Sequence, residues 1–345
     1  MPPISALTAI PAMPALTVMA AKPVSFGFPS PDSAMISGFP GLTGSGVALT
    51  FLILLVIAVI WRALYEPGAL EITRRTLVAS EQDPVHKDPT HGDPAVWSSE
   101  SAVQNLSRVE MASVRVALFS DLHADSLRIR PDELIRPIRQ AGVDALIFLG
   151  DLASDDAQAK LAAPFLSELA DFARGARIPF FSVPGNHDGP EARHILDTLG
   201  ISLLENQQIL FTTSSSVEVL VTGLADLRSG HPDPALLNGR ADHPIRIVLA
   251  HNPDTVLDLP ERGADFFLSG HFHGGQIYAP LQLEFRLLRP EVLPRKGIWR
   301  GAFRLNGYTG YITRGLGCVW LPLRLFSRPE LALLELQVPA VPSGT

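Results

Sequence analysis

The sequence predicts an α/β domain with packed β-sheets, preceded by one apolar helix long enough to cross a membrane. Two observations carry this prediction. After residue 114, short apolar or β-branched runs alternate with segments of helical periodicity, as they do where strands and helices alternate along a chain. Before it, residues 46–61 form one apolar run. A length of 345 residues is enough for one large domain with a sizeable core.

The first part of the chain is rich in Pro, Ala, Met, Gly and Ser and shows no sustained periodicity. Because such a composition offers little apolar surface for packing, we expect a disordered tail over residues 1–45. A second, short tail is expected at residues 339–345.

The apolar run that follows carries no charge between Asp32 and Arg62. A membrane span needs about 20 apolar residues, and the segment 46–65 approaches that length. We therefore expect an uncleaved single-pass anchor that contacts the membrane through residues 46–61. The alternatives are a buried core helix and a cleaved signal peptide. A signal peptide needs a basic segment directly before its apolar run and a small-residue cleavage site after it, and neither is clear here.

Basic residues follow the span at Arg62, Arg74 and Arg75, whereas only Lys22 precedes it. Under the positive-inside rule, this asymmetry predicts that the large C-terminal domain is cytoplasmic.

Charge and cysteine content exclude several classes of protein. The 28 basic and 35 acidic residues give a formal net charge of −7. A general nucleic-acid binder needs a basic surface, so we expect no nucleic-acid partner. The single cysteine, Cys318, excludes an intrachain disulfide and a metal site built from thiolates alone. An acidic protein that binds a phosphate would need bound cations to reverse the local field.

The remaining elements are taken in chain order. Residues 66–113 should hold a lead-in strand at Glu71–Val78 and then a polar insertion, because residues 80–107 are rich in Asp, Pro, Ser and His. The main domain is expected over residues 114–338. Its strands are predicted at residues 114–119, 145–149, 179–183, 216–222, 245–249, 265–268, 308–313 and 331–337. Its helices are predicted at about residues 131–140, 157–174 and 190–199.

Five polar blocks each follow directly after one of these strands. In chain order they are Asp121-Leu122-His123, Gly150-Asp151, Gly185-Asn186-His187-Asp188, His251-Asn252 and Gly270-His271-Phe272-His273. Each block alone is a weak signal. The presence of all five blocks, each directly after a predicted strand, indicates that their donor atoms converge on one point of the fold.

The donors are carboxylate, amide and imidazole groups, a mixture that suits Mn²⁺, Fe, Zn²⁺ or Mg²⁺. Asp121 and His123 are two residues apart, as are His271 and His273, and alternate side chains of an extended segment point the same way. The set is too large for one tetrahedral ion, so we expect two divalent metal ions that share Asp151. Two ions about 3.5–4 Å apart can clamp a phosphoryl group and hold a bridging hydroxide.

The order D-x-H, G-D, G-N-H-[DE], a lone H and G-H-x-H resembles the calcineurin-like metallophosphoesterase superfamily over roughly Val114 to Gln337. The resemblance implies a four-layered αββα sandwich, in which two packed mixed β-sheets are flanked by helices. The Gly270–Gln276 signature G-H-x-H-G-G-Q, the lead-in from Tyr65 to Arg74 and the segment 313–317 are similar to a bacterial branch whose members are often membrane-tethered or exported.

The resemblance also implies a role for each polar residue of the blocks. For the first metal ion, the implied ligands are Asp121, His123, Asp151 and His273. For the second, they are Asp151, Asn186, His251 and His271. His187 is implied to lie beside the leaving-group oxygen as a general acid or hydrogen-bond donor, with Asp188 as the residue that orients it.

We therefore expect a metal-dependent hydrolase that cleaves a phosphate monoester, diester or pyrophosphate by means of a metal-bridging hydroxide, on a membrane-associated or lipid-linked substrate. One alternative, known within relatives, is a UDP-2,3-diacylglucosamine-type pyrophosphatase of lipid A synthesis. Another is a soluble or exported nucleotide phosphodiesterase, with residues 46–61 removed as a signal. A non-catalytic scaffold is disfavoured, because every expected ligand is present.

Three further residues or segments each have two interpretations. Arg314 lies in a Gly-rich turn where it could reach a substrate phosphate, or it is paired with a carboxylate. Asp155 is either an acceptor that supports the site or a helix N-cap. The segment 319–326 is apolar enough to touch acyl chains, but ordinary core packing is the simpler expectation.

Overall fold

A computed structural model describes residues 44–79, 111–239, 245–278, 284–285 and 289–339. The predicted tails and polar insertion lie outside these residues, apart from Gly44, Ser45 and Pro339. The chain divides into two compact units, Met1–Ile53 and Leu54–Thr345, and the second unit holds both sheets.

The apolar run forms the helix α1 (Gly44–Tyr65), which is followed by a 3₁₀ turn, η1 (Glu66–Gly68). Within Gly46–Gly68, an 18-residue window has a mean hydropathy of 2.6, so this stretch is long and apolar enough to cross a membrane. No residue of the 18-residue apolar window in that stretch is buried, whereas Glu66 and Pro67 in η1 are, which disfavours the core-helix alternative for the apolar run. A signal sequence has the same length and composition, so the helix by itself does not separate the other two interpretations.

The first sheet is mixed and has the strand order β1-β12-β2-β3-β4-β5. Its strands are β1 (Glu71–Val78), β2 (Met111–Phe119), β3 (Ala145–Phe148), β4 (Phe180–Ser182), β5 (Ser202–Leu203) and β12 (Glu330–Pro339). Strand β12 runs antiparallel to β2 and parallel to β1, and β2, β3 and β4 are parallel. The lead-in strand is therefore the edge of the sheet that also carries the first polar blocks.

The second sheet is also mixed, with the order β10-β11-β9-β8-β7-β6. Its strands are β6 (Gln207–Thr212), β7 (Glu218–Gly223), β8 (Ile245–Leu249), β9 (Phe266–Ser269), β10 (Gly301–Leu305) and β11 (Tyr308–Ile312). The inner strands β7, β8, β9 and β11 are parallel, whereas β6 and β10 are antiparallel to their neighbours.

The two sheets pack face to face through one apolar core. Alternate residues of the first sheet, such as Val116 and Leu118, belong to the same buried cluster as Ile247, Leu249 and Phe266 of the second. Because successive side chains of a strand point to opposite faces, the residues between them face outward. The predicted pair of packed mixed sheets is thus confirmed.

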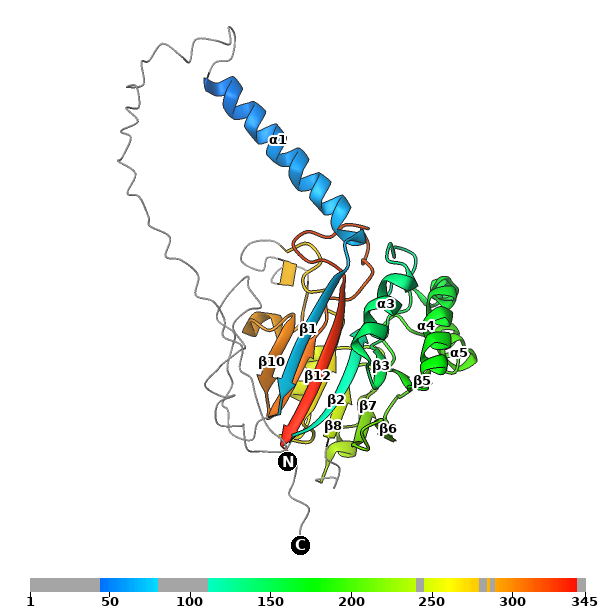
Figure 1. The fold of residues 1–345 in the computed structure, drawn as a ribbon. Coiled ribbons are helices and arrows are strands. Elements are labelled where there is room, and N and C mark those ends of the chain that lie inside the picture. The colour runs from blue at the N-terminus through cyan, green and yellow to red at the C-terminus, as the bar shows by residue number, and fades with distance from the viewer. Residues whose placement is uncertain (1–43, 80–110, 240–244, 279–283, 286–288, 340–345) are drawn as a thin grey trace, which may run out of the picture. The chain divides into compact units, whose positions relative to one another are not determined.

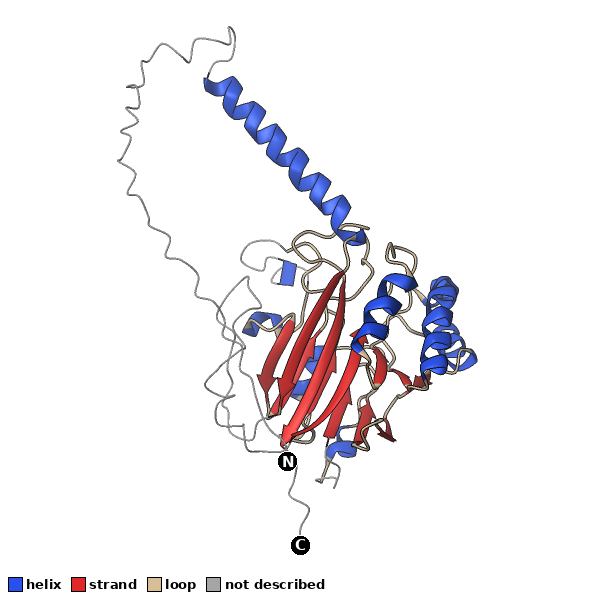
Figure 2. Cartoon of the chain, viewed as in Figure 1, coloured by secondary structure: helices blue, strands red, loops and turns tan. Residues whose placement is uncertain are grey.

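Helices cover the outer face of the first sheet (Figures 1 and 2). They are α3 (Pro131–Ala141), α4 (Ala163–Ala176) and α5 (Pro190–Thr198). Phe119 and Phe148 belong to the buried cluster that includes Leu134 of α3 and Leu166 of α4. The outer face of the second sheet carries shorter helical turns. In the described residues it is covered by loops and the short 3₁₀ turns η3 (Pro234–Leu237), η4 (Pro253–Leu257) and η6 (Pro294–Lys296).

One predicted helix is divided, and the cause is a proline. The segment predicted at residues 157–174 begins as a 3₁₀ helix, η2 (Asp156–Ala162), and continues as α4. Pro164 lies in the first turn of α4, where its missing N–H leaves no helical hydrogen bond unmade. Three short strands were not predicted, namely β5, β6 and β10.

Candidate metal centre

The polar blocks converge because parallel strands end at the same level in both sheets. Phe119 of β2 is in register with Phe148 of β3, and Leu249 of β8 is in register with Leu268 of β9. The loops beyond them are then joined by backbone hydrogen bonds. In the first sheet, the amide of Asp121 donates to the carbonyl of Gly150 at 2.9 Å. In the second, the amide of Gly270 donates to the carbonyl of His251 at 3.0 Å.

Backbone strain is concentrated in these loops. Five of the twelve non-glycine residues with positive φ in the described chain are candidate metal ligands. They are Asp121 (φ 50), His123 (φ 37), Asp151 (φ 60), His271 (φ 66) and His273 (φ 52). L-residues seldom adopt this left-handed conformation. It is retained where the surrounding structure holds the side chain in one required direction. The strain therefore supports the selection of these residues as candidate metal ligands.

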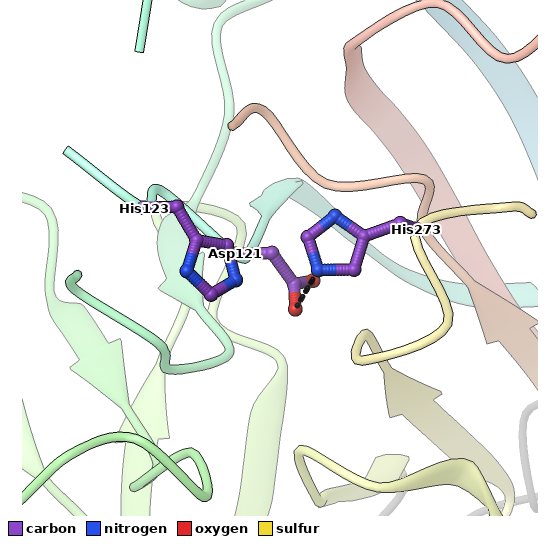
Figure 3. A group of neighbouring side chains, drawn as sticks. All are labelled: Asp121, His123 and His273. Atoms are coloured by element: carbon purple, nitrogen blue, oxygen red, sulfur yellow. Dashed lines mark ion pairs between the residues drawn. The ribbon is translucent and has the colours of Figure 1, made fainter. Parts of the chain in front are cut away.

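The first group of donors consists of Asp121, His123 and His273, all buried (Figure 3). Their donor atoms all lie within 4.8 Å of one another. Nε2 of His273 is 3.3 Å from Oδ1 of Asp121, and the rings of His123 and His273 are 5.0 Å apart. One carboxylate and two imidazoles thus face a common point.

The second group consists of Asp151, His251 and His271, whose donor atoms also lie within 4.8 Å of one another. Nε2 of His251 is 3.2 Å from Oδ2 of Asp151 and 3.1 Å from Nδ1 of His271. The same Asp151 oxygen is 3.7 Å from Nε2 of His123 in the first group. Asp151 therefore stands between the two groups, as expected of a residue shared by two ions.

Hydrogen bonds select the nitrogen that each histidine of the second group turns to the centre. Nδ1 of His251 lies 2.6 Å from the carbonyl oxygen of Leu149, which can only accept, so this nitrogen carries the proton. Nε2 of His271 lies 3.2 Å from the Glu291 carboxylate and carries its proton for the same reason. The opposite nitrogens, Nε2 of His251 and Nδ1 of His271, are then the ones turned to the centre, and such support is usual for metal-binding histidines.

Glu291 is a candidate site residue that sequence reasoning missed. It is buried, and its Oε1 also accepts from Nη2 of Arg228 at 2.6 Å. Burial raises the pKa of Glu291, but the hydrogen bond from His271 and the nearby Arg289 outweigh burial and lower it to about 2. No motif surrounds it in the sequence, and its contact with His271 in the structure reveals it.

Unpartnered polar atoms test whether the donor set fits metal ions. Oδ1 of Asp121, both ring nitrogens of His123 and Oδ1 of Asn186 are buried without a hydrogen-bond partner. Buried polar atoms are costly when unpaired, so their concentration here fits ligands of cations. Burial also lowers the pKa of His123, His271 and His273, which keeps these imidazoles neutral and able to bind a metal.

The electrostatics of Asp151 support the same conclusion. Burial raises the pKa of Asp151, but the charge of His251 and its hydrogen bond to Asp151 outweigh burial and lower the pKa. Conversely, burial lowers the pKa of His251, and Asp151 more than reverses this and raises it well above its usual value. The site thus stabilises positive charge beside Asp151, which is the property that a divalent cation requires.

Two glycines allow the loops to approach this closely. A Cβ on Gly185 would lie 2.2 Å from Oδ1 of Asp151, and one on Gly150 would lie 2.3 Å from the amide nitrogen of Gly185. Both contacts involve groups that cannot move without disturbing the site, so only glycine fits.

His187 lies beside the first group. Its ring is 5.5 Å from that of His123, edge to face, and it is only half-buried. Its backbone N–H donates to Oδ1 of Asp151 at 2.9 Å, so this loop wraps around the shared carboxylate.

Asp188 has a different environment from the one expected for a residue that orients His187. Its carboxylate accepts the backbone amides of Asp151, Leu152 and Gly185, each at 2.8 Å. Burial and the neighbouring Asp151 raise the pKa of Asp188 to about 6. The observed contacts join the two loops rather than reach the His187 ring.

The two residues with open interpretations are now placed. Arg314 is ion-paired, with Nη2 2.9 Å from Glu71 and 3.2 Å from Glu330, so the carboxylate-paired interpretation is confirmed. Asp155 accepts the backbone amide of Gln158 at 3.0 Å and is the N-cap of η2.

The core-packing expectation for residues 319–326 is wrong for three of the large side chains. Trp320 is 90% exposed, Leu321 55% and Phe326 49%. In contrast, Arg324 in the same segment is fully buried.

Comparisons with known proteins identify the family of the domain that carries the two groups of donors. Residues 114–275 match the model of the calcineurin-like phosphoesterase family. The chain is 35% identical over 240 residues to "Phosphodiesterase YaeI" of Escherichia coli (strain K12), covering 65% of this chain and 83% of that protein. This chain belongs to the calcineurin-like phosphoesterase family.

Further relatives differ in how they are named. The chain is 26% identical over 224 residues to "Uncharacterized metallophosphoesterase YkoQ" of Bacillus subtilis (strain 168), covering 63% of this chain and 81% of that protein. It is 27% identical over 310 residues to "Transmembrane protein with metallophosphoesterase domain" of Bos taurus, covering 80% of this chain and 66% of that protein. Among solved structures, TT1561 of Thermus thermophilus matches with a TM-score of 0.32 and 13% identity, over 46% of this chain and 82% of that one.

Proposed function

We propose that this chain is a dinuclear metal-dependent phosphoesterase with Asp151 as the ligand shared by two divalent ions. The observation that carries the proposal is the position of the Asp151 carboxylate, 3.2 Å from His251 and 3.7 Å from His123. The first ion would be held by Asp121, His123, Asp151 and His273. The second would be held by Asp151, Asn186, His251 and His271. The amide oxygen of Asn186 joins the set because it is buried and unpartnered.

Two bound divalent ions would supply positive charge for the phosphoryl oxygens and lower the pKa of water. The residues of the chain do the rest. Leu149 and Glu291 hold the rings of His251 and His271 by accepting their outer N–H groups. His187, half-buried beside the first group, donates a proton or hydrogen bond to the leaving-group oxygen. Asp188 is a positioning residue that joins the loops of Asp151 and Gly185.

The substrate in this proposal is a phosphate ester or pyrophosphate that is membrane-associated or lipid-linked. The apolar helix α1 supports membrane attachment, with the catalytic domain on the cytoplasmic side under the positive-inside rule. The name of the Escherichia coli relative supports a phosphodiester. The G-H-x-H-G-G-Q signature supports a place in the membrane-tethered bacterial branch.

Metal analysis followed by turnover assays tests the proposal. Full-length protein purified in detergent should bind about two divalent ions per chain and hydrolyse an activated phosphate ester after Mn²⁺ loading. Asp151→Ala should lose both properties. Asp155→Ala, which removes a nearby exposed carboxylate that caps η2, should retain both.

The choice of substrate separates the alternatives. Bis-p-nitrophenyl phosphate, p-nitrophenyl phosphate and a UDP-acylglucosamine report diesterase, monoesterase and lipid-linked pyrophosphatase activity respectively. Inertness of the metal-loaded protein towards all three would overturn the enzymatic proposal and favour a scaffold.

A further inference from the structure

We propose that Trp320, Leu321 and Phe326, together with Trp61, Leu64 and Tyr65 at the end of α1, form a surface that docks into the interface of a lipid bilayer. We call these six residues the docking surface. Docking places the metal centre at the level of the lipid headgroups, so that the phosphate it acts on belongs to a bilayer lipid. The substrate part of this inference rests on the proposed function.

Exposure is the first observation. Trp320 is 90% exposed, Leu321 55% and Phe326 49%, and the end of α1 exposes Trp61 (64%), Tyr65 (55%) and Leu64 (48%). Single exposed apolar residues are common, but a group rich in tryptophan and other aromatic side chains marks a binding surface. Tryptophan and tyrosine are also the side chains enriched where membrane meets water.

The two segments that carry the docking surface are hydrogen-bonded to each other. The backbone amide of Arg324 donates to the carbonyl of Ala63 at 3.1 Å, and the amide of Ser327 donates to Glu66 at 3.2 Å. The guanidinium of Arg62 lies 4.2 Å from the centre of the Phe326 ring. Because the end of a helix apolar enough to cross a membrane is fastened to this loop, a bilayer is the occupant that the structure favours.

Backbone conformation is a second, independent observation. Trp320 has φ 63 and Phe326 has φ 56, in the region that bulky L-residues rarely adopt. A bulky residue in this region raises the conformational free energy of the folded chain, as residues at other strained positions do. At Trp320 and Phe326 this backbone conformation directs a large apolar side chain into solvent. A loop selected only for stability would bury these rings or replace them with glycine or asparagine.

The docking surface is also rigidly attached to the metal centre. Gln276, three residues after His273, donates from Nε2 to the carbonyls of Val319 (3.1 Å) and Leu321 (3.0 Å). Its Oε1 accepts the amide of Val319 at 2.7 Å. The signature glutamine thus holds the apolar loop rather than a substrate.

A second attachment comes from the loop of Asp121, another member of the first group of donors. The amide of Gly317 donates to the carbonyl of Asp121 at 2.7 Å, and a Cβ on Gly317 would lie 2.0 Å from the carbonyl oxygen of Leu122. The loop cannot move away from the ligands without breaking these contacts. A bilayer that holds Trp320 therefore also fixes the position of Asp121.

Fluorescence of full-length protein in phosphatidylcholine vesicles tests docking directly. The fluorescence of Trp320 is obtained by subtracting the emission spectrum of Trp320→Phe from that of the wild type. We expect this signal to be blue-shifted and quenched by lipids brominated on their acyl chains. A Trp320 signal that is unquenched and has the emission of tryptophan in water would overturn the proposal.

A substrate comparison tests the consequence for catalysis. The variant Trp320→Asn/Leu321→Ser keeps the backbone, because asparagine tolerates positive φ. We expect its hydrolysis of a phosphate-ester lipid in vesicles to fall about tenfold or more, with unchanged hydrolysis of soluble bis-p-nitrophenyl phosphate. Leu161→Ser is the matched control, since Leu161 is also 55% exposed but lies in η2; it should change neither rate.

The two proposals fail differently. If wild type hydrolyses the soluble ester but the double variant cleaves the vesicle lipid at the wild-type rate, the docking surface does not serve catalysis. If the metal-loaded wild type hydrolyses neither ester, the phosphoesterase proposal fails, whereas the fluorescence measurement still decides whether Trp320 enters the bilayer.

Discussion

Glu291 lies with Oε1 3.2 Å from Nε2 of His271, so that a buried carboxylate accepts from the outer nitrogen of a candidate metal ligand. The same oxygen is 2.6 Å from Nη2 of Arg228, whose side chain is 41% exposed. The arrangement orients the His271 ring and increases its basicity, which strengthens metal binding.

We predict that Glu291→Ala weakens binding of the second metal ion about 10–100-fold. Glu291→Gln should be milder, because its amide oxygen still accepts a hydrogen bond although the charge is lost. Titration of metal-free protein with Mn²⁺ measures the effect. Glu168→Ala, which removes an exposed carboxylate on α4, is the control. Wild-type affinity in Glu291→Ala would remove Glu291 from the metal centre.

His187→Ala should separate proton donation from metal binding. His187 contributes a backbone amide, not its ring, to Asp151, so the variant should keep its metal content. Turnover should fall by about 10²–10⁴-fold, as expected when a general acid is lost. His194→Ala on α5, an exposed histidine with no part in the centre, should turn over normally. If His187→Ala loses metal in proportion to activity, the residue is structural.

The residues of this centre that could be predicted from the sequence are those that directly follow a strand. Asp121, Asp151 and His251 each follow a strand whose apolar pattern is plain, and parallel strands deliver such residues to one edge. Glu291 could not be predicted in this way, because a loop without periodicity brings it to His271. The same holds for Gln276, whose partners lie more than 40 positions along the chain.

The fold shows a similar division. Strand β8 matches its predicted bounds because it is an inner strand of apolar residues. In contrast, β6 (Gln207–Thr212) lies at a sheet edge and has the sequence QQILFT, without alternation of polar and apolar residues, and β5 has two residues. Such short edge strands are defined by their pairing partners more than by their own pattern.

Arg314 is predicted to act in stability rather than in substrate binding. Its guanidinium is ion-paired with Glu71 and Glu330, and Glu330 is buried. Arg314→Ala leaves Glu330 without its partner, which costs about 3–5 kcal/mol of unfolding free energy for a buried pair. Chemical denaturation in detergent measures this loss. Arg314→Lys keeps the charge, and its KM for a phosphate ester should equal that of wild type; a raised KM in a folded variant would restore Arg314 to the substrate site.

Glu330 should contribute to the dependence of stability on pH. Burial raises the pKa of Glu330, but Arg314 and the hydroxyls of Thr73 and Tyr311 outweigh burial and lower the pKa in the folded protein. A carboxyl whose pKa is lower when folded stabilises the protein above its unfolded pKa of about 4.3. This stabilisation is lost as the pH falls through the folded value.

Tyr311→Phe tests this linkage without removing a charge. The variant loses the hydrogen bond of 2.8 Å from the Tyr311 hydroxyl to Glu330, so the folded pKa of Glu330 moves back towards its ordinary value. We expect the unfolding free energy of wild type to fall more steeply than that of Tyr311→Phe between about pH 5 and pH 3, because wild type has more proton-linked stability to lose. The two proteins share every other acidic group, so their difference isolates Glu330. Parallel curves would show that this buried carboxyl does not govern the acid sensitivity of the fold.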